Sequence, residues 1–321
     1  MIVKTLFVMD PLDRINVAGD STYMLMLEAR ARGWPVWYCT PDDLFALGGL
    51  ARARCWPVEV RRGTPAFEPG PAEERALGDF DLVWMRKDPP FHMGYIFSTY
   101  LLDLVPPTTV VLNHPPSLRN RNEKLFAAAF AEFGPLTLIT REVARAVAFA
   151  MEAPDRVVLK PWDGNGGRGV LVTHKDDDNL RSMIETLTEE GRSYILVQRY
   201  LPAIKAGDKR IILVDGEPRG WMNRIPQKGD HRGNMHVGAT VAETELTPRE
   251  AEICGVLGPI LKREGLVFVG IDVIGDNLTE INVTSPTGIQ EINRLMGTRL
   301  EVEITDAALR RLSAARATCA A

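Results

Sequence analysis

The sequence predicts an α/β protein, with a parallel α/β unit at its N-terminus and a mixed α+β part after it. Short apolar segments alternate with helical patterns through the first third of the chain, which is typical of a parallel sheet with crossover helices. In the later part, apolar segments flank glycine-rich turns, which is typical of antiparallel pairs. A chain of 321 residues is long enough for two or three domains.

The composition is that of an ordinary globular enzyme. The formal net charge is -4 and the pI about 5.8, which disfavours a nucleic-acid partner because phosphate binding needs a basic face. No apolar run approaches the roughly 20 residues of a membrane span, and the N-terminus lacks the pattern of a signal peptide. The four cysteines are scattered and form no C-x-x-C pair, so neither disulfides nor zinc are expected. We therefore expect a cytoplasmic enzyme with hard-metal or metal-free chemistry.

The first third carries the elements of the parallel unit. Polar residues follow two of its strands, Asp10 after the first and Arg86-Lys87-Asp88 after a later one. Because open α/β sheets bind ligands beyond the carboxyl ends of their strands, these residues are either ligand contacts or simple loop caps. The stretch Arg61–Gly78 is rich in Gly, Pro and Arg and predicts a surface excursion. Strands are predicted at Thr5–Met9, Pro35–Cys39, Phe80–Met85 and Val110–Asn113, and helices at Tyr23–Arg32 and near Gly94–Leu104.

The pattern of predicted helices and strands changes near Ser117. The pattern predicts a single helix over Ser117–Phe133, with Ser117 as its N-cap and Lys124 in its interior. Further helices are predicted at Arg141–Ala150, Asp177–Glu190 and Pro248–Glu264. Strands are predicted at Leu136–Thr140, Val157–Lys160, Val170–Thr173, Tyr194–Tyr200, Lys209–Val214, Pro218–Ile225, Val267–Ile274 and Leu278–Val283.

A glycine loop between two predicted strands carries the first chemical signal. Gly164, Gly166 and Gly169 satisfy G-x-G-x-x-G, but a dinucleotide-binding fold requires a helix after the glycines, and Val170–Thr173 is β-branched. A phosphate loop of the Walker type is also excluded, because no Lys-Ser or Lys-Thr follows. The segment predicts a hairpin flap whose backbone N–H groups cover phosphates, or a plain hairpin turn without a ligand. Lys160, at the end of the preceding strand, and Lys124 are the candidate cations.

A second constellation predicts a hard-cation site. Asp272 lies within an apolar strand, and Glu280 and Asn282 share one face of the next strand. The turn signal at residues 275–277 predicts antiparallel pairing, which would bring the three side chains together. Two carboxylates and an amide oxygen favour Mg²⁺, with Mn²⁺ as the alternative ion. The competing reading is a row of solvent-facing polar residues, although a carboxylate between Ile271 and Val273 would be costly without a partner.

Cationic residues stand between these two constellations. Lys209-Arg210 begin one predicted strand and Arg224 ends another, just before the polar, glycine-rich loop Ile225–Ala239. The planar guanidinium of arginine suits carboxylate or phosphate. The loop has the composition of a flexible lid and equally that of an ordinary surface loop.

Together these blocks resemble the ATP-grasp superfamily, and more closely the bacterial glutathione synthetases. The matching blocks follow the order of the family through most of the chain. They are MDPLDRIN (Met9–Asn16) with Asp20-Ser21, MRKDPPF (Met85–Phe91), NEKLF (Asn122–Phe126), LKPWDGNGGRGV (Leu159–Val170), QRYLPAIKAGDKR (Gln198–Arg210), VDGEP (Val214–Pro218), RIPQ (Arg224–Gln227) and FVGIDVIGDNLTEINVTSPTG (Phe268–Gly288).

The resemblance implies an ATP-grasp fold with an N-terminal substrate domain at 1–121, a central lid domain at 122–201 and a C-terminal domain at 202–321. It implies that the γ-glutamylcysteine carboxylate attacks the γ-phosphate of ATP, and that glycine then attacks the acylphosphate to give glutathione. Small molecules would be the partners, without nucleic acid or membrane, and the chain would form a homo-oligomer. The alternatives are an ATP-grasp carboxylate–amine ligase with another acceptor, and an ATP-binding regulatory module without catalysis.

The resemblance also implies a role for each matching residue. The phosphates would contact Lys124 and Lys160 under the flap formed by Gly164, Asn165, Gly166, Gly167 and Gly169. Gln198, Tyr200 and Leu201 would line the adenine and Asp208 the ribose. Asp272, Glu280 and Asn282 would hold metal. Arg210, Arg224 and Lys160 would be catalytic, Ser285, Pro286 and Thr287 would border the acceptor, and Asp10, Ser21, Arg86 and Arg224 would contact substrate carboxylates or the dipeptide.

Two positions depart from the family pattern. Gly238-Ala239-Thr240 stands where a Gly-Gly-Arg is expected, so one positive charge is missing near the end of the lid loop. Trp162 replaces a differently shaped residue after Lys160-Pro161. Both departures leave the predicted ATP site intact and bear on the specificity for acceptor or dipeptide.

Overall fold

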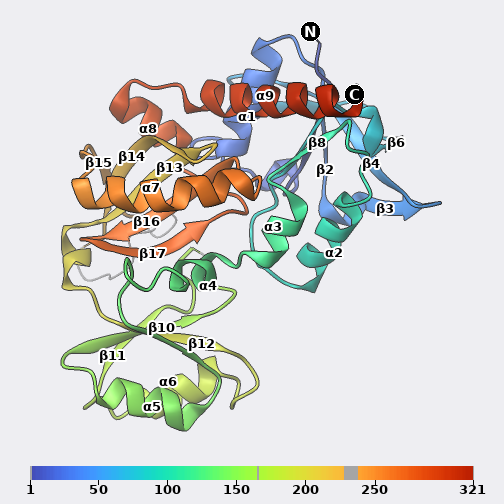
Figure 1. Cartoon of the computed structure of the whole chain (residues 1–321). Helices are drawn as coiled ribbons and strands as arrows, with labels where there is room; N and C mark the ends of the chain where they lie inside the picture. The colour runs from blue at the N-terminus through green and yellow to red at the C-terminus, as the bar shows by residue number, and fades with distance from the viewer. Residues whose placement is uncertain (1, 165, 228–237, 321) are drawn as a thin grey trace.

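The computed structural model describes residues 2–164, 166–227 and 238–320. Their strands form three sheets (Figure 1). The four-stranded sheet and its two helices project from a larger body that contains the other two sheets. Short 3₁₀ turns lie at Leu12–Arg14, Pro41–Asp43, Leu77–Asp79 and Pro202–Ala206.

The N-terminal sheet has the predicted parallel core. Its strands β1 (Thr5–Val8), β2 (Val36–Cys39), β7 (Leu82–Met85) and β8 (Val110–Leu112) pair in the order β2-β1-β7-β8. The crossovers contain α1 (Ser21–Ala31) and α2 (Met93–Leu102). Because Val8 pairs with Met85, Asp10 and Arg86 emerge at the same edge of the sheet, as expected for neighbouring parallel strands.

Antiparallel strands extend this sheet beyond the predicted elements. They are β3 (Leu44–Leu47), β4 (Leu50–Val60), β5 (Phe67–Pro69) and β6 (Glu73–Ala76), and β3, β5 and β6 each pair with β4. The stretch Arg61–Gly78 is mostly exposed, as expected of a surface excursion, but it also contains the two short strands β5 and β6. Pro69 ends β5, a position that proline tolerates at a sheet edge.

The predicted helix Ser117–Phe133 is wrong, because the chain forms two short helices there. They are α3 (Pro115–Asn120) and α4 (Glu123–Ala128). Prolines in the first turn of α3 start that helix before Ser117, whose hydroxyl donates instead to the Glu264 carbonyl at 2.6 Å. Asn122 begins the second helix, because its side chain accepts hydrogen bonds from Lys124 N and Leu125 N. Lys124 therefore lies in the first turn of a helix and not in the middle of one.

The four-stranded sheet has its own small core. Its order is β11-β10-β12-β9, all antiparallel, with β9 (Thr137–Thr140), β10 (Arg156–Pro161), β11 (Leu171–His174) and β12 (Ile195–Arg199). Helices α5 (Val143–Met151) and α6 (Leu180–Leu187) cover one face, and α6 is shorter than the predicted Asp177–Glu190. Ala146, Ile184 and Val197 belong to its buried cluster.

The C-terminal sheet supplies the other side of the site. Its order is β15-β14-β13-β16-β17, again antiparallel, with β13 (Asp208–Val214), β14 (Glu217–Ile225), β15 (Thr240–Ala242), β16 (Phe268–Ile274) and β17 (Asn277–Asn282). Helix α7 (Pro248–Arg263) agrees with its prediction. Beyond the strand predicted at Leu278–Val283 the pattern assigned no element, yet α8 (Ile289–Met296) and α9 (Leu300–Ala320) follow.

The first and last parts of the chain share their hydrophobic core. Helix α9 packs against α1 and β8, and Figure 1 shows α9 lying along α1. The buried cluster that contains Phe7 also contains Phe268 and Ile304. Residues far apart in the sequence thus form one rigid support for the substrate-facing loops between them.

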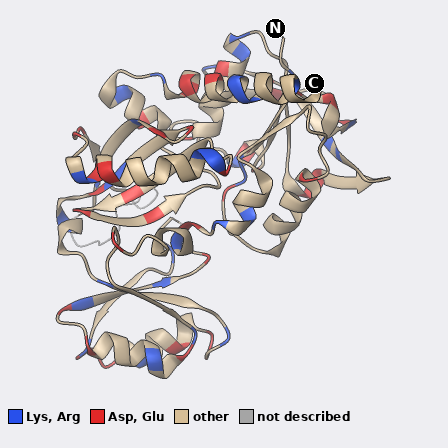
Figure 2. Ribbon diagram, in the orientation of Figure 1, with Lys and Arg blue, Asp and Glu red and all other residues tan. Residues whose placement is uncertain are grey.

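Charges are mixed over the surface. Figure 2 shows basic and acidic residues interspersed on all three sheets and their helices, with no basic face in that view. Among the residues that the structure describes, no helix is long and apolar enough to cross a membrane.

Candidate active site

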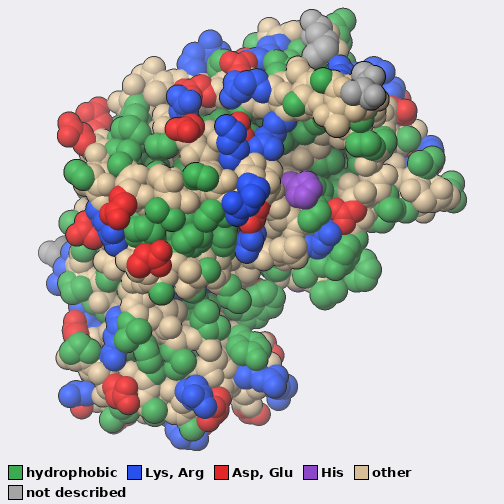
Figure 3. Space-filling view, viewed as in Figure 1, with side chains coloured by type: hydrophobic (Ala, Val, Ile, Leu, Met, Phe, Trp, Pro, Cys, Tyr) green, Lys and Arg blue, Asp and Glu red, His purple; other side chains and the backbone are tan. Residues whose placement is uncertain are grey.

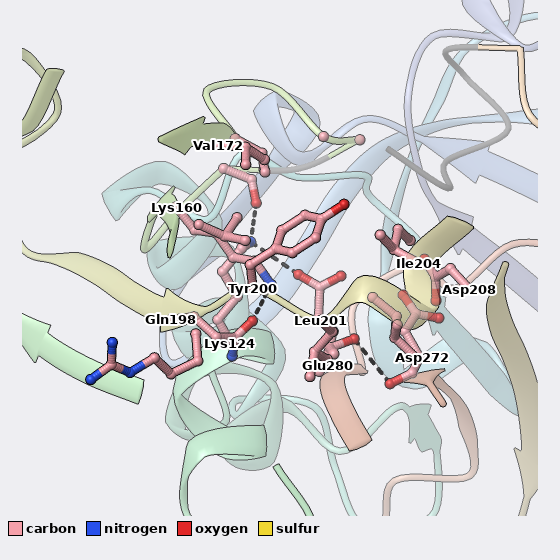
Figure 4. Close-up of a pocket in the computed structure, with 18 residues that line it drawn as sticks. Lys124, Lys160, Val172, Gln198, Tyr200, Leu201, Ile204, Asp208, Asp272 and Glu280 are labelled. Atoms are coloured by element: carbon pink, nitrogen blue, oxygen red, sulfur yellow. Dashed lines mark hydrogen bonds and ion pairs between the residues drawn. The ribbon is translucent and has the colours of Figure 1, made fainter. Parts of the chain in front are cut away.

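A cavity lies between the four-stranded sheet and the C-terminal sheet. Polar and charged side chains converge on it from both sheets and from α4, and Figure 4 shows them. Its lining is Lys124, Val158, Lys160, Gly164, Gly166, Gly167, Val170, Val172, Gln198, Arg199, Tyr200, Leu201, Ile204, Asp208, Asp272, Ile274, Thr279 and Glu280.

The glycine loop is the turn of a hairpin, as predicted. Strands β10 and β11 pair antiparallel, with Leu159 opposite Leu171, so a strand and not a helix follows the glycines. Gly166, Gly167 and Gly169 have φ values of 58°, 78° and 71°, in the left-handed region that favours glycine. Gly164 and two of these glycines line the cavity, while Asn165 lies outside the described residues.

Lys160 enters the cavity from β10. Its Nζ donates to Gln198 Oε1 on the adjacent strand β12 at 2.9 Å, and Gln198 Nε2 in turn donates to Thr137 Oγ1 at 2.9 Å. These bonds hold the lysine and the amide in fixed orientations inside the cavity (Figure 4). Burial lowers the pKa of Lys160, although the nearby Glu280 carboxylate opposes the shift.

Lys124 connects three parts of the site. From the first turn of α4, its Nζ lies 3.0 Å from Glu280 Oε1 and also donates to the carbonyl of Gly164. Burial works to lower the pKa of Lys124, but the Glu280 carboxylate outweighs it and the pKa is raised. The ammonium therefore stays charged between the flap and the C-terminal sheet.

A buried ion cluster lies at the base of the cavity. Arg210 binds Asp272 in bidentate fashion, with Nε 2.6 Å from Oδ1 and Nη2 3.0 Å from Oδ2. Arg224 Nη2 lies 2.6 Å from Asp208 Oδ2 and 3.0 Å from Asp272 Oδ1. Burial works to raise the pKa of Asp272, but the two guanidinium groups outweigh it and lower the pKa to about 2. Both predicted catalytic arginines thus meet the predicted metal ligand.

The carboxylate of Asp208 has one oxygen that is paired and one that is not, among the described residues. Its Oδ2 pairs with Arg224, whereas Oδ1 is buried and has no hydrogen-bond partner among the described residues. Burial raises the pKa of Asp208, against the effect of Arg224. An unpaired buried carboxylate oxygen that faces a ligand cavity is suited to accept hydrogen bonds from sugar hydroxyls.

The three predicted metal ligands meet as the strand pattern implied. Asp272 pairs with Glu280 across β16 and β17, and Asn282 Nδ2 donates to Asp272 Oδ2 at 3.2 Å. The described residues contain no group of three or more His, Cys, Asp or Glu side chains arranged to hold a metal ion. Two carboxylates and an amide are oxygen donors of the kind that a hard cation takes together with phosphate and water.

The candidate substrate residues lie where the N-terminal sheet meets the C-terminal part. Arg86 is buried, and its Nη2 donates to Pro286 O at 2.9 Å, while Ser285 Oγ donates to Arg86 O at 3.3 Å. Ser21 Oγ accepts a hydrogen bond from Ile289 N at 3.3 Å. Each of these hydrogen bonds joins the N-terminal part of the chain to its C-terminal part.

Two further candidates have partners of their own. Thr287 O accepts a hydrogen bond from Arg210 Nη1 at 3.2 Å. Asp10, by contrast, pairs with Lys87 at 3.0 Å and accepts a hydrogen bond from Asp88 N, at the edge of the N-terminal sheet.

Tyr200 and Leu201 line the cavity at the end of β12. The backbone N–H of Tyr200 donates to Arg156 O at 3.0 Å, and the guanidinium of Arg156 lies 3.9 Å from the Tyr200 ring centre. If Tyr200 reads the edge of adenine, it does so through its carbonyl.

The cavity also has an apolar lining that the sequence analysis did not single out. Val158 and Lys160 alternate on one face of β10, and a period of two from Lys160 would have identified the valine. After the flap, Val170 and Val172 are likewise two residues apart, and both line the cavity. Ile204 and Ile274 come from distant segments, and only the fold brings them here.

Comparison with known proteins identifies the family. The model of the prokaryotic glutathione synthetase N-terminal domain matches residues 3–119, and the model of the prokaryotic glutathione synthetase ATP-grasp domain matches residues 123–297. The chain belongs to the prokaryotic glutathione synthetase family. A glutathione synthetase of Brucella melitensis biotype 1 is 45% identical over 309 residues, covering 96% of this chain and 98% of the relative. One from Agrobacterium fabrum is 46% identical over 301 residues, covering 93% and 94%.

Solved structures support the fold. The crystal structure of the D-cycloserine synthetase DcsG superposes with a TM-score of 0.68 at 15% identity, covering 96% of this chain and 99% of that one. The family models and the relatives confirm the glutathione synthetase resemblance and the assignment as an ATP-dependent ligase, and the ATP-grasp domain model together with this superposition confirms the fold.

The structure describes both positions at which the sequence departs from the family pattern. Trp162 follows the flap strand, and its ring meets Phe91 of the N-terminal part edge-on, with centroids 6.2 Å apart. Its carbonyl accepts a hydrogen bond from Asn122 Nδ2 at 3.1 Å. Thr240 begins the edge strand β15 and is exposed. Of the lid loop Ile225–Ala239, residues 228–237 lie outside the described residues.

Proposed function

We propose that this protein joins γ-glutamylcysteine to glycine with ATP, giving glutathione, ADP and phosphate. The observation that carries the proposal is the convergence of Lys124, Lys160, the glycine flap, Asp272 and Glu280 on one cavity, with Asn282 hydrogen-bonded to Asp272. Cations and a hard-metal set facing each other across a cavity suit a nucleoside triphosphate. The chain's membership of the glutathione synthetase family supports the choice of substrates.

ATP fits the residues that line the cavity. Val158, Val172 and Ile204 offer apolar contacts to a purine, and Gln198 offers its amide. Asp208 Oδ1 would accept a hydrogen bond from the ribose. Lys124 and Lys160 would neutralise the phosphates under the flap.

The divalent metal is proposed to be Mg²⁺, held by Glu280, Asn282 and Asp272. When bound, it would neutralise phosphate charge during transfer. Asp272 makes its present contacts with Arg210 and Arg224, so metal ligation would compete with or share these contacts. The two arginines would then be placed beside the transferring phosphate, where their charge stabilises it.

The chemistry requires no protein nucleophile. The carboxylate of the dipeptide attacks the γ-phosphate and ADP leaves, and the amine of glycine then attacks the acylphosphate carbonyl and releases phosphate. The protein supplies alignment, charge neutralisation and exclusion of water, which would otherwise hydrolyse the acylphosphate. The N-terminal and C-terminal parts meet at Arg86, Ser285 and Pro286, which we propose as the border of the dipeptide and acceptor sites.

Phosphate release tests this function. The protein is incubated with Mg-ATP and γ-glutamylcysteine, with and without glycine, and then with a panel of other amines. We expect release that depends on both γ-glutamylcysteine and glycine, with glutathione as the product. Release only with another amine would favour a ligase of different acceptor specificity, a possibility motivated by Thr240 in place of an arginine. Absence of release under every condition would support the regulatory module.

Lys160→Met is expected to raise the KM for ATP roughly 10- to 100-fold, because a charge-assisted hydrogen bond to phosphate contributes about 1.5–3 kcal/mol. The measurement is initial rate against ATP concentration at saturating γ-glutamylcysteine and glycine. Lys175→Met, an exposed lysine just beyond β11, is the matched control and should leave the KM for ATP unchanged. An unaltered KM for ATP in Lys160→Met would contradict the phosphate role.

We also propose that the chain forms a homo-oligomer through α2. Met93, Phe97 and Tyr100 share one face of this helix and are 59%, 61% and 49% exposed. Leu47 and Leu50 are exposed on the neighbouring hairpin, and Figure 3 shows hydrophobic side chains gathered over this region. An apolar patch of this kind is typical of an interface between proteins.

Phe97→Glu is expected to convert the oligomer to monomer, because a carboxylate buried in an apolar contact loses its hydration. Light scattering coupled to size-exclusion chromatography measures the mass. Tyr194→Glu replaces an equally exposed aromatic residue on the projecting unit and should leave the mass unchanged. A native chain that is monomeric at micromolar concentration would refute the proposal.

Cytoplasmic location and the domain boundaries 1–121, 122–201 and 202–321 stay proposals. The boundaries are supported by the two matched family segments, residues 3–119 and 123–297, and by the separate core of the projecting unit.

A further inference from the structure

A half-buried carboxylate outside the predicted site lies between its parts. Glu123 occupies the first position of α4, immediately before Lys124. Its Oε1 accepts three hydrogen bonds: from Val283 N at 3.0 Å, from Thr284 N at 3.1 Å and from Thr284 Oγ1 at 2.8 Å. Burial raises the pKa of Glu123, which marks the carboxyl as withdrawn from water.

The two residues that donate these bonds lie between the proposed metal ligands and the proposed acceptor segment. Val283 directly follows Asn282, the last member of the metal set, and Thr284 directly precedes Ser285. This short connection leaves strand β17, so the sheet ladder no longer fixes its backbone. The Glu123 carboxylate binds both N–H groups and one hydroxyl of this connection, and Asn113 Nδ2 donates to the Val283 carbonyl at 2.8 Å.

The same helix also orients Lys124 toward Glu280. Lys124 Nζ lies 3.0 Å from Glu280 Oε1, so two consecutive residues of α4 contact both ends of the segment from Glu280 to Thr284. Glu123, Lys124 and Thr284 also line a small pocket beside the main cavity. Helix α4 is thus a clamp across the metal-ligand strand and the segment that leads to the acceptor site.

We propose that Glu123 is a positioning residue for the ligase reaction: by fixing the Val283–Thr284 backbone, it sets the place of Asn282 and of the acceptor segment Ser285–Thr287 relative to Lys124. This inference rests on the proposed function. Residues that orient metal ligands typically affect metal affinity or activity 10- to 100-fold when removed.

The test compares Glu123→Ala with Glu123→Gln. The alanine variant is expected to raise both the Mg²⁺ concentration for half-maximal activity and the KM for glycine about 10- to 100-fold, with the KM for ATP changed less than threefold. The glutamine variant keeps an acceptor oxygen and is expected to restore both constants to within about threefold of native. Thr284→Val, which removes one donor of the three, should give a smaller shift in the same direction.

Glu250→Ala is the matched control. Glu250 is a buried carboxylate near the start of α7, accepts a hydrogen bond from Thr247 N at 2.7 Å and lies outside the cavity. Its loss should lower the melting temperature without changing the Mg²⁺ or glycine constants. If Glu123→Ala shows the same behaviour, with lower stability and native constants, Glu123 is only structural and the inference fails. Equal impairment of the alanine and glutamine variants would also overturn it.

A readout without turnover separates this inference from the function. Backbone amide hydrogen exchange of Val283 and Thr284, and Mg²⁺ affinity in the presence of ADP by calorimetry, are measured for native protein and Glu123→Ala. Faster exchange at these two amides and weaker Mg²⁺ binding are expected even if the acceptor is not glycine. Unchanged exchange would refute the clamp, whereas absence of turnover in the native protein would refute only the ligase function.

Discussion

Glu280→Gln is expected to reduce the rate of glutathione formation roughly 100- to 1,000-fold while the protein stays folded. Glutamine keeps the shape of the side chain but removes the charge that faces both Lys124 and the proposed metal. Losing this carboxylate would weaken the hold on the proposed metal, which would neutralise phosphate charge during transfer. The measurement is phosphate release with all three substrates, together with circular dichroism and the Mg²⁺ dependence of the residual rate.

The same hairpin provides the control for this variant. Asp276 lies in the turn between β16 and β17 and is exposed, so Asp276→Asn removes an equal charge a few residues away. Its activity should remain native. Retained turnover in Glu280→Gln would disprove the metal assignment, because a ligand of a catalytic metal cannot be dispensable.

Arg210→Met is expected to lower the free energy of unfolding by about 3 kcal/mol, the lower end of the range for breaking a buried ion pair. Asp272 would lose its bidentate partner and keep Arg224 and Asn282. Ligation should fall at least 100-fold, because the guanidinium holds Asp272, which lines the cavity and is a proposed metal ligand. Urea unfolding measures the stability and phosphate release measures the rate.

A double variant separates the two roles of Arg210. Arg210→Met with Asp272→Leu removes both charges of the pair, and Arg224 retains Asp208 at 2.6 Å, so stability should recover while ligation does not. Arg145→Met breaks an exposed pair with Glu142 and should change the stability by less than about 1 kcal/mol. Recovery of activity in the double variant would show that Arg210 serves folding alone.

Local patterns predicted most of the elements that carry the site. The β-branched run after Gly169 predicted a strand, and the structure has β11 there, which settles the flap against a dinucleotide loop. The i, i+2 spacing of Glu280 and Asn282, with a turn signal before them, predicted their meeting with Asp272. These inferences succeeded because strand pairing across a tight turn is determined by residues close in the sequence.

Long-range context decided the features that the patterns missed. The helical pattern over Ser117–Phe133 was interrupted because the Asn122 side chain caps a new helix whose residues then contact β17. The buried cluster of Arg210, Arg224, Asp208 and Asp272 joins strands β13, β14 and β16. The sequence pattern did not indicate that these charges pair with one another. Only the paired sheet shows that these arginines meet the acidic side chains inside the protein.

The sequence by itself determined the family, the glycine hairpin and the meeting of Asp272 with Glu280 and Asn282, because each depends on residue types at short, fixed spacings. The tertiary structure decided how these parts act on one another. It placed Lys124 against Glu280, left Asp208 Oδ1 without a partner among the described residues, and brought Glu123 to the backbone beyond Asn282. Those contacts join residues up to 161 positions apart, and the packing of whole sheets and helices, which no local spacing encodes, brings them together.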